Sequence, residues 1–275
     1  MRKTLIIAGL YSFLLATPLY AAFNYLPVDP KGTAMSGAMT ALPGETWGIF
    51  YNPASAASGG RTSAGVSYTI PYGDSDLSNV AGALNLSRLS FDAKGTISVG
   101  FNRYSADDYH ETTCIVGYGR EILPSVRLGV SISRMTQKFD GFSDDSATGI
   151  NAGLQAELTP IVSLGISSMS LNSPTIGESD THLPRTTLTG LAFHFPTGSF
   201  LTVNALTDPD RSSRLLAAGD FVVAPMMNVM IGLATNPSLI SGGVSFGTDA
   251  IKATIAVSRN LDLGTTSSFG LEAGW

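Results

Sequence analysis

Short stretches in which every second residue is apolar recur along most of the chain. In 251–257 an apolar residue fills each odd position from Ile251 to Val257, with Lys252 and Thr254 between them. The stretches 126–132 and 150–158 repeat this pattern. A period of two with one apolar face predicts β-strands. The other face carries mainly Gly, Ser, Asn and Gln, which is more typical of a crowded barrel lumen than of a sheet face in water.

About fourteen such stretches follow one another, and an even number is typical of bacterial barrels made from one chain. The sequence therefore predicts an all-β fold, a transmembrane antiparallel β-barrel of about 14 strands over residues 61–275. The strands are expected near 62–70, 79–88, 95–104, 111–121, 125–137, 147–158, 161–171, 185–195, 198–206, 213–224, 227–236, 239–247, 249–259 and 265–275.

Two of these stretches contain a local irregularity. The apolar positions change phase within 161–171, from Val162, Leu164 and Ile166 to Met169 and Leu171, which predicts a bulge near Ser167 and Ser168. In the stretch 239–247, the pair Gly242 and Gly243 predicts either a kink or a close approach of other backbone.

The composition supports a membrane barrel. Only 13% of the 275 residues are charged and 44% are hydrophobic, whereas a soluble domain carries about a quarter charged residues. Beyond the N-terminus no apolar run reaches the roughly 18 residues that a spanning helix needs. A secreted all-β protein and an outer-membrane barrel remain as the two classes. The net charge of −5 argues against nucleic acid as a partner, and the lone Cys114 is expected to be buried or to face lipid.

The N-terminus has the features of a secretory signal peptide. Arg2 and Lys3 precede an apolar run over 5–15, Pro18 ends it, and Ala21 closes a plausible cleavage site. A retained anchor is the alternative, although the run is short for a span. We therefore expect residues 1–21 to be removed and the protein to be exported.

The connections between the expected strands alternate in character. Tight ones, such as Leu123-Pro124, alternate with mostly longer, acidic ones. With both termini in the periplasm, the acidic set faces outward. It either binds divalent cations among lipopolysaccharide head groups or only keeps this end soluble. The acidic residues are Asp74, Asp76, Asp107, Asp108, Asp140, Asp144, Asp145, Glu178, Asp180, Asp208 and Asp210.

The last stretch ends on an aromatic residue. Phe269, Leu271 and Trp275 lie on one face of the expected final strand. Such an end resembles the signal read by the outer-membrane insertion machinery, although a soluble sandwich can end in the same way. We expect lipid and lipopolysaccharide around the barrel, and the insertion machinery as a transient partner.

The segment 22–60 lacks the alternation and is rich in Gly and Ala. It contains Gly32 and Gly37, and it ends in Tyr51 followed by Asn52, Pro53 and Ala54. Taken alone, it fits either an ordinary N-terminal loop or a compact plug.

This glycine and Tyr-Asn-Pro-Ala pattern resembles the N-terminal hatch of the FadL-type outer-membrane transporter superfamily. It is most similar to the PorV/PorQ-like branch. The chain departs from that pattern at Pro43-Gly44-Glu45-Thr46 and is short. The resemblance implies a barrel plugged by residues 22–60, through which hydrophobic compounds enter from outside and leave sideways through a gap in the wall.

Specific roles follow for residues of this segment. Asn52 is expected to anchor the plug to strand backbone beside such a gap. Five larger apolar residues either line an apolar path for a ligand or pack the hatch: Met35, Met39, Trp47, Ile49 and Phe50.

No enzyme motif stands out. His110, His182 and His194 are far apart, without a Ser/His/Asp spacing, metal cluster or cofactor motif. A hydrolase built on His194 and a lumenal Ser is the remaining enzyme hypothesis. Glu157 and Asp220 are expected to pair with lumenal cations such as Arg127 and Lys252.

Two functions remain open. The first is passive transport of small hydrophobic molecules across the bacterial outer membrane. The second is a barrel without transport that serves a protein secretion system as a scaffold or shuttle, as in PorV-like relatives, with a secretion-system protein as its partner.

Overall fold

A computed structural model describes residues 23, 25–58, 60–89, 92–177, 181–209, 211–248 and 250–275. The predicted signal peptide lies outside these residues, as do Glu178, Asp180 and Asp210 of the acidic set. Among the described residues, no helix is both long enough and apolar enough to cross a membrane.

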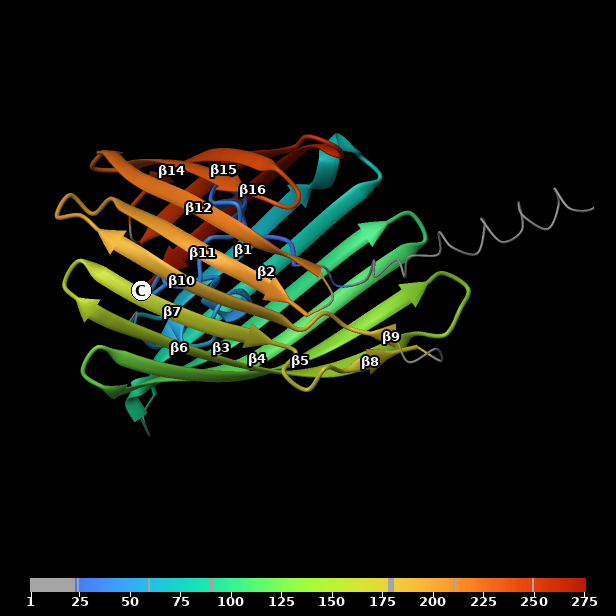
Figure 1. Cartoon of the computed structure of the whole chain (residues 1–275), viewed down its shortest axis with the longest axis horizontal. Helices are drawn as coiled ribbons and strands as arrows, with labels where there is room; N and C mark the ends of the chain where they lie inside the picture. The colour runs from blue at the N-terminus through green and yellow to red at the C-terminus, as the bar shows by residue number, and fades with distance from the viewer. Residues whose placement is uncertain are drawn as a thin grey trace, which may run out of the picture.

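Fourteen antiparallel strands form one closed ring (Figure 1), so the predicted fold class is confirmed. In chain order each strand pairs with the next, and β1 pairs with β16 to close the ring. A separate two-stranded sheet, β8 (Thr175–Ile176) and β9 (Thr181–His182), interrupts the order between β7 and β10. The ring strands are β1 (Ser63–Ile70), β2 (Leu77–Leu89), β3 (Asp92–Ala106), β4 (Tyr109–Leu123), β5 (Val126–Phe139), β6 (Asp145–Thr159), β7 (Val162–Met169), β10 (Thr186–His194), β11 (Phe200–Asp208), β12 (Arg211–Ala224), β13 (Met227–Ala234), β14 (Leu239–Gly247), β15 (Ile251–Asn260) and β16 (Gly264–Gly274).

The two ends of the barrel differ. At one end β1 begins, β16 finishes, and short turns such as that between β4 and β5 join the strands; we call this the turn end. The other end, the loop end, carries the η3 turn (Pro71–Gly73) and the long connection 170–185 with β8 and β9. The predicted alternation of tight and mostly longer connections is therefore confirmed.

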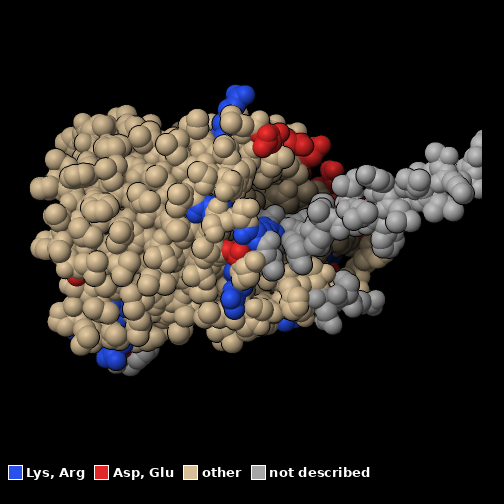
Figure 2. All heavy atoms as spheres, in the orientation of Figure 1, with Lys and Arg blue, Asp and Glu red and all other residues tan. Residues whose placement is uncertain are grey.

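The outer face of the ring is apolar. Val66, Val130 and Ile255 point outward and are more than half exposed, as their alternation predicts. Cys114 is also exposed on this face. On the side shown in Figure 2, Lys, Arg, Asp and Glu gather toward the loop end and leave most of the remaining surface uncharged. Exposed apolar surface of this extent is typical of contact with lipid.

No bulge lies at Ser167 and Ser168 themselves, because β7 keeps an unbroken register with β10 from Val162 to Met169. The phase does change just beyond them, because Met169 lines the cavity whereas Leu171 is exposed like Ile166. An extra residue lies there: Ser168 pairs with Ala152, but the N–H of Leu171 donates to the carbonyl oxygen of Ile150, and Ser170 has a φ of +55°. At Gly243 the close approach is confirmed, because a methyl group there would meet the side chain of Ala34.

Residues 25–58, which we call the lumenal segment, lie inside the ring (Figure 1, blue). The segment contains α2 (Pro30–Ala34) and two short 3-10 turns, η1 (Gly48–Phe50) and η2 (Ser55–Ser58). Most of its residues are buried. Glycines of the wall permit this fit: a methyl group at Gly129 would overlap the backbone of Pro53 and Ala54, and one at Gly153 would overlap Asn52.

Candidate lumenal binding site

A cavity of about 750 Å³ occupies the loop half of the lumen. Its floor is the side of the lumenal segment that faces the loop end, including Val28, Thr33 and Phe50. Its wall consists of inward residues from the loop halves of the strands, for example Ile115 of β4 and Leu206 of β11. The volume lies within the range of about 300–1,000 Å³ that is usual for small-molecule sites.

The lining combines apolar and polar groups. Leu26, Phe50 and Met135 supply apolar surface. Tyrosines are prominent on the loop side, where Tyr72, Tyr104 and Tyr109 present rings that each carry one hydroxyl. The lining also includes the charged residues Glu111, Asp208, Arg211 and Arg214. A site of this kind suits a mainly apolar molecule whose orientation is fixed by a few polar contacts.

Asn52 anchors the floor of the cavity to the wall. Its Nδ2 donates to the carbonyl oxygen of Thr40 at 2.9 Å and to that of Leu154 in β6 at 3.1 Å, and its Oδ1 accepts from the N–H of Ala54. Leu154 itself pairs with Leu128 on one side and Ile166 on the other. The wall is therefore continuous beside Asn52, and the gap expected there is not present.

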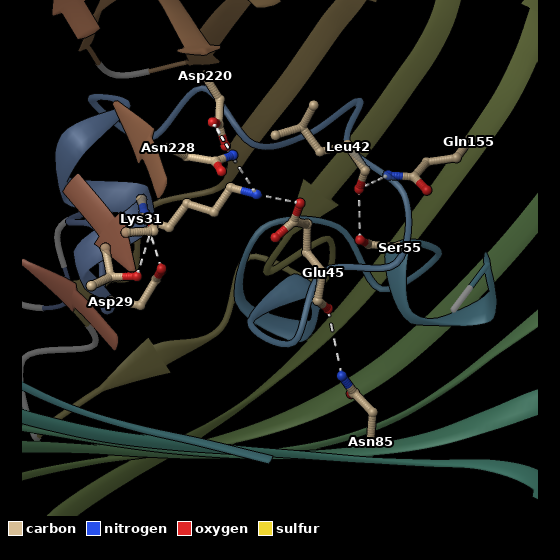
Figure 3. Close-up of polar contacts among 12 residues, drawn as sticks. Asp29, Lys31, Leu42, Glu45, Ser55, Asn85, Gln155, Asp220 and Asn228 are labelled. Carbon is tan, nitrogen blue, oxygen red and sulfur yellow. Dashed lines mark hydrogen bonds and ion pairs between the residues drawn. The ribbon is translucent and has the colours of Figure 1, made fainter. Parts of the chain in front are cut away.

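Gln155, the next residue of β6, holds a second point of the lumenal segment. Its Nε2 donates to the carbonyl oxygens of Thr40 at 3.0 Å and Leu42 at 2.9 Å. Ser55 adds a bond from its hydroxyl to the same Leu42 carbonyl, as Figure 3 shows. These bonds satisfy backbone groups of a segment that has little secondary structure of its own.

A buried ionic cluster joins the lumenal segment to the wall at β12 and β13 (Figure 3). Lys31 Nζ lies 2.7 Å from Glu45 Oε1 and 3.7 Å from Asp220 Oδ2, and Asn228 donates to Asp220 at 2.7 Å. Burial acts to lower the pKa of Lys31, but the carboxylates of Glu45 and Asp220 outweigh it and raise that pKa. The predicted pair of Arg127 with Glu157 is confirmed at 2.5 Å, whereas Asp220 pairs with Lys31 of the lumenal segment.

Asp29 and Tyr51 form a second buried contact below the cavity. Tyr51 donates to Asp29 Oδ1 at 2.5 Å, and the N–H of Gly32 donates to Asp29 Oδ2 at 3.0 Å. Burial raises the pKa of Asp29 to about 7, although both hydrogen bonds act to lower it. The carboxyl group therefore changes charge near neutral pH, inside the segment that forms the floor.

The five predicted apolar-path residues lie in two places. Phe50 lines the cavity. Met35, Met39, Trp47 and Ile49 are almost completely buried where the lumenal segment packs in the barrel. Whether any of the five contacts a ligand stays a prediction.

The residues of the predicted insertion signal share the outer surface. Phe269 and Leu271 are exposed on β16. Trp275 is 70% exposed, and its backbone exchanges two hydrogen bonds with Thr62 at the turn end. Their part in membrane insertion stays a prediction.

The structure brings His194 and Ser163 together, with 3.0 Å between Nε2 and Oγ. A serine hydrolase also needs a group that orients the histidine and space for the substrate beside the serine. The nearby carboxylate of Glu157 is held by Arg127, and neither Ser163 nor His194 belongs to the cavity lining. In the described part of the chain, no group of three or more metal-ligating side chains forms a metal site.

Asn79 and Asn102 of the cavity wall were not predicted as site residues. Both are polar residues at inward positions of predicted strands, which is the signal that could have identified them. The floor residues Val28 and Thr33 carried no such signal. The lumenal segment has no regular repeat of apolar residues, so the sequence does not show which of its side chains face the cavity.

No protein-family model matches the chain, and no curated protein matches its sequence. Solved structures do match. The structure is similar to the CymD monoaromatic hydrocarbon channel, with a TM-score of 0.65 at 11% identity over 92% of this chain and 99% of that one. The fold is that of the FadL-type channels.

Two further structures support this assignment. A Pseudomonas aeruginosa FadL homologue gives a TM-score of 0.64 at 12% identity, over 91% of this chain and 98% of that one. The Ralstonia pickettii toluene transporter TbuX gives 0.61 at 11% identity, over 92% of this chain and 98% of that one. These similarities support the FadL-type part of the predicted resemblance and do not extend to the PorV/PorQ-like branch.

Proposed function

We propose that the chain is an outer-membrane channel for the passive passage of small hydrophobic molecules. The observation that carries this proposal is the cavity of about 750 Å³, which lies at the loop end of a FadL-type barrel above a packed floor. The structures of similar fold include a monoaromatic hydrocarbon channel and a toluene transporter.

The cavity has a physical reason to attract such molecules. Moving apolar surface out of water is favourable by roughly 25 cal/mol per Å². Phe50, Ile115 and Met135 offer this surface inside the barrel. Because the gain is independent of chemical detail, it draws apolar solutes as a class, and the polar groups of the lining then select among them.

In this proposal the lumenal segment is the hatch. Residues 22–60 form the hatch domain and 61–275 the barrel, with Gly32, Gly37, Asn52, Pro53 and Ala54 as the hatch motif. The bonds of Asn52 and Gln155 support this role, because they hold a segment of little secondary structure across the lumen.

A pair of tryptophan substitutions on β15 tests the channel. Ser258 lines the cavity, and its neighbour Val257 points outward and is 45% exposed. Ser258→Trp is expected to fill part of the cavity and lower uptake, whereas Val257→Trp adds the same group on the outer side. The measurement is the entry rate of a hydrophobic fluorescent dye into vesicles whose outer leaflet is lipopolysaccharide, which slows direct passage. Equal uptake by empty vesicles, wild type and Ser258→Trp contradicts the proposal.

We further propose that the chain reaches the outer membrane after removal of residues 1–21 and contacts lipid and lipopolysaccharide there. Phe269, Leu271 and Trp275 then act as the signal for the insertion machinery. Trp275→Ser is expected to lower the amount of heat-modifiable barrel in outer membranes, with Phe246→Ser as a control for loss of an exposed aromatic residue elsewhere.

The alternative of a PorV-like scaffold for a secretion system has no observation in its favour. Its signature is a protein partner that copurifies in mild detergent at a fixed ratio. Recovery of such a partner, together with no dye uptake, would replace the channel proposal.

A further inference from the structure

Two asparagines on adjacent strands present unpaired polar atoms at the cavity. Asn79 of β2 and Asn102 of β3 both line it. Asn79 is 7% exposed. In the register of these strands Asn79 lies opposite Tyr104, and Asn102 opposite Ala81, so the two asparagines are diagonal neighbours on the inner face.

The Oδ1 atom of each is buried and has no hydrogen-bond partner within the described part of the chain. Buried polar atoms in native proteins are nearly always paired. The amides of Asn52 and Asn151 do pair: Asn52 donates to Thr40 and Leu154, and Asn151 donates to Ser131 and accepts from the N–H of Ser170. The amide oxygens of Asn85, Gln155 and Asn204 are also unpaired, but these three residues lie away from the cavity. Of the buried unpaired side-chain atoms found among these residues, those of Asn79 and Asn102 are the ones that line the cavity.

An unpaired carbonyl oxygen in a cavity wall discriminates between solutes. A solute that brings an O–H group supplies the hydrogen bond that this oxygen lacks, whereas a hydrocarbon leaves the oxygen without one. A site with an unpaired acceptor therefore binds a hydroxylated molecule more tightly than the same molecule without its hydroxyl group.

We propose that the cavity selects apolar molecules that carry a hydroxyl group, whose hydrogen bond Asn79 and Asn102 accept. This inference rests on the channel function above and names its substrate class. The carbon skeleton lies against apolar lining such as Phe50 and Ile115, and the hydroxyl lies at the wall formed by β2 and β3.

A carboxylate ligand is the competing chemistry, because Arg214 also lines the cavity. Its Nε lies 3.4 Å from the carbonyl oxygen of Thr235, and no carboxylate of the described residues pairs with it. Glu111 lines the same cavity and accepts from Tyr109 at 2.7 Å and from the N–H of Phe23 at 3.1 Å. With a carboxylate already in the lining and two neutral acceptors unpaired, the arrangement favours a neutral donor.

The test compares matched solutes on the full protein in nanodiscs, measured by equilibrium dialysis against empty nanodiscs. The probes are p-cresol, p-xylene, 4-methylanisole and 4-methylbenzoate. The first two differ by OH against CH₃, the third keeps the oxygen but has no donor, and the fourth is anionic. We expect p-cresol to bind about three- to tenfold more tightly than p-xylene and 4-methylanisole, as one or two hydrogen bonds allow.

Substitution by a similarly sized apolar residue locates the effect. In the double variant Asn79→Leu/Asn102→Leu the preference for p-cresol is expected to disappear while p-xylene still binds. Asn204→Leu is the matched control, because Asn204 is a buried lumenal asparagine whose Oδ1 is also unpaired but which does not line the cavity. It should keep the wild-type preference.

Each outcome is decisive. Equal binding of p-cresol, p-xylene and 4-methylanisole by wild type overturns the selectivity and leaves the channel proposal standing, as does a preference for 4-methylbenzoate. Binding of none of the four counts against the channel proposal itself. The wild-type comparison needs no variant, so a double variant that fails to fold does not remove the test.

Discussion

The two halves of the lumen differ in what their polar side chains contact. In the turn half, the lumenal segment fills the barrel, and Asn52, Gln155 and Lys31 each reach a specific partner. In the loop half, a cavity remains, and Asn79 and Asn102 reach none at Oδ1. The same kinds of residue therefore serve packing in one half and leave binding capacity in the other.

This difference identifies which substitutions should affect stability and which should affect ligands. A polar group with a protein partner stabilises the docked segment, and losing one member leaves the other unpaired. A polar group without a partner contributes little to docking and is available to a solute. The predictions below test this division in order of expected effect.

Lys31→Met should have the largest effect. Lys31 is 13% exposed at its side chain, and its loss leaves Glu45 and Asp220, at 15% and 5%, without their cation. Breaking a buried ion pair costs about 3–5 kcal/mol. Hydrogen exchange of amides 30–57 should show the lumenal segment opening more often. The double variant Lys31→Met/Asp220→Asn should recover part of the loss, and unchanged exchange in the single variant would refute the anchoring role.

Gly153→Val is expected to come next. Its side chain would overlap the Asn52 amide and the Pro53 ring, and overpacking costs about 1–3 kcal/mol. Gly82→Val is the matched control, because the nearest atom to a methyl group there is the Gly65 carbonyl oxygen at 3.7 Å. Protease cleavage within 25–58 should rise in the first variant only. Equal cleavage in both would show that the segment does not rest on this wall.

Asn52→Leu and Asn79→Leu compare the halves directly. The first removes the bonds of the Asn52 amide to the Leu154 carbonyl and the Ala54 N–H, and it leaves the Thr40 carbonyl with Gln155 as its side-chain donor, at about 1–3 kcal/mol for each group left unsatisfied. The second removes an unpaired group, so exchange of the lumenal segment should stay at the wild-type rate or slow down. If both variants loosen the segment equally, the division between the halves is wrong.

The smallest effect is expected from pH. Burial raises the pKa of Asp29 to about 7, against an ordinary value of 3.8. Because the pKa of Asp29 is higher in the docked segment than in the opened one, the protonated carboxyl group stabilises the docked segment. This stabilisation is complete below pH 3.8 and is lost as pH rises through 7. Between about pH 6 and 8 the opening constant of the segment should rise about tenfold. Hydrogen exchange, corrected for intrinsic rates, measures this, and Asp29→Asn should remove most of the dependence.

The strands could be predicted from the sequence because a period of two survives in every one of them. All fourteen fell close to their observed bounds. The irregularity within 161–171 was predicted slightly too early, because Met169 is apolar but faces the lumen, and the phase changes at Ser170.

The site could be predicted only in part. The Tyr51–Ala54 pattern indicated a packed segment, and Asn52 does bond to strand backbone as expected. Which side of that segment faces a cavity depends on how it folds, and a run without periodicity does not reveal this. For the same reason Lys31 was missed as the partner of Asp220, since the cation comes from the segment and not from a neighbouring strand.

The ring closes between its first and last strands, where Thr62 and Trp275 exchange backbone hydrogen bonds. No hairpin holds these two edges together, so they meet only after all the intervening strands are in place. The residues that fill the interior precede β1 in the chain and are therefore made before any of the wall. A circular permutant opened at another turn would place these residues between β16 and β1, so part of the wall would be made before the segment that fills it.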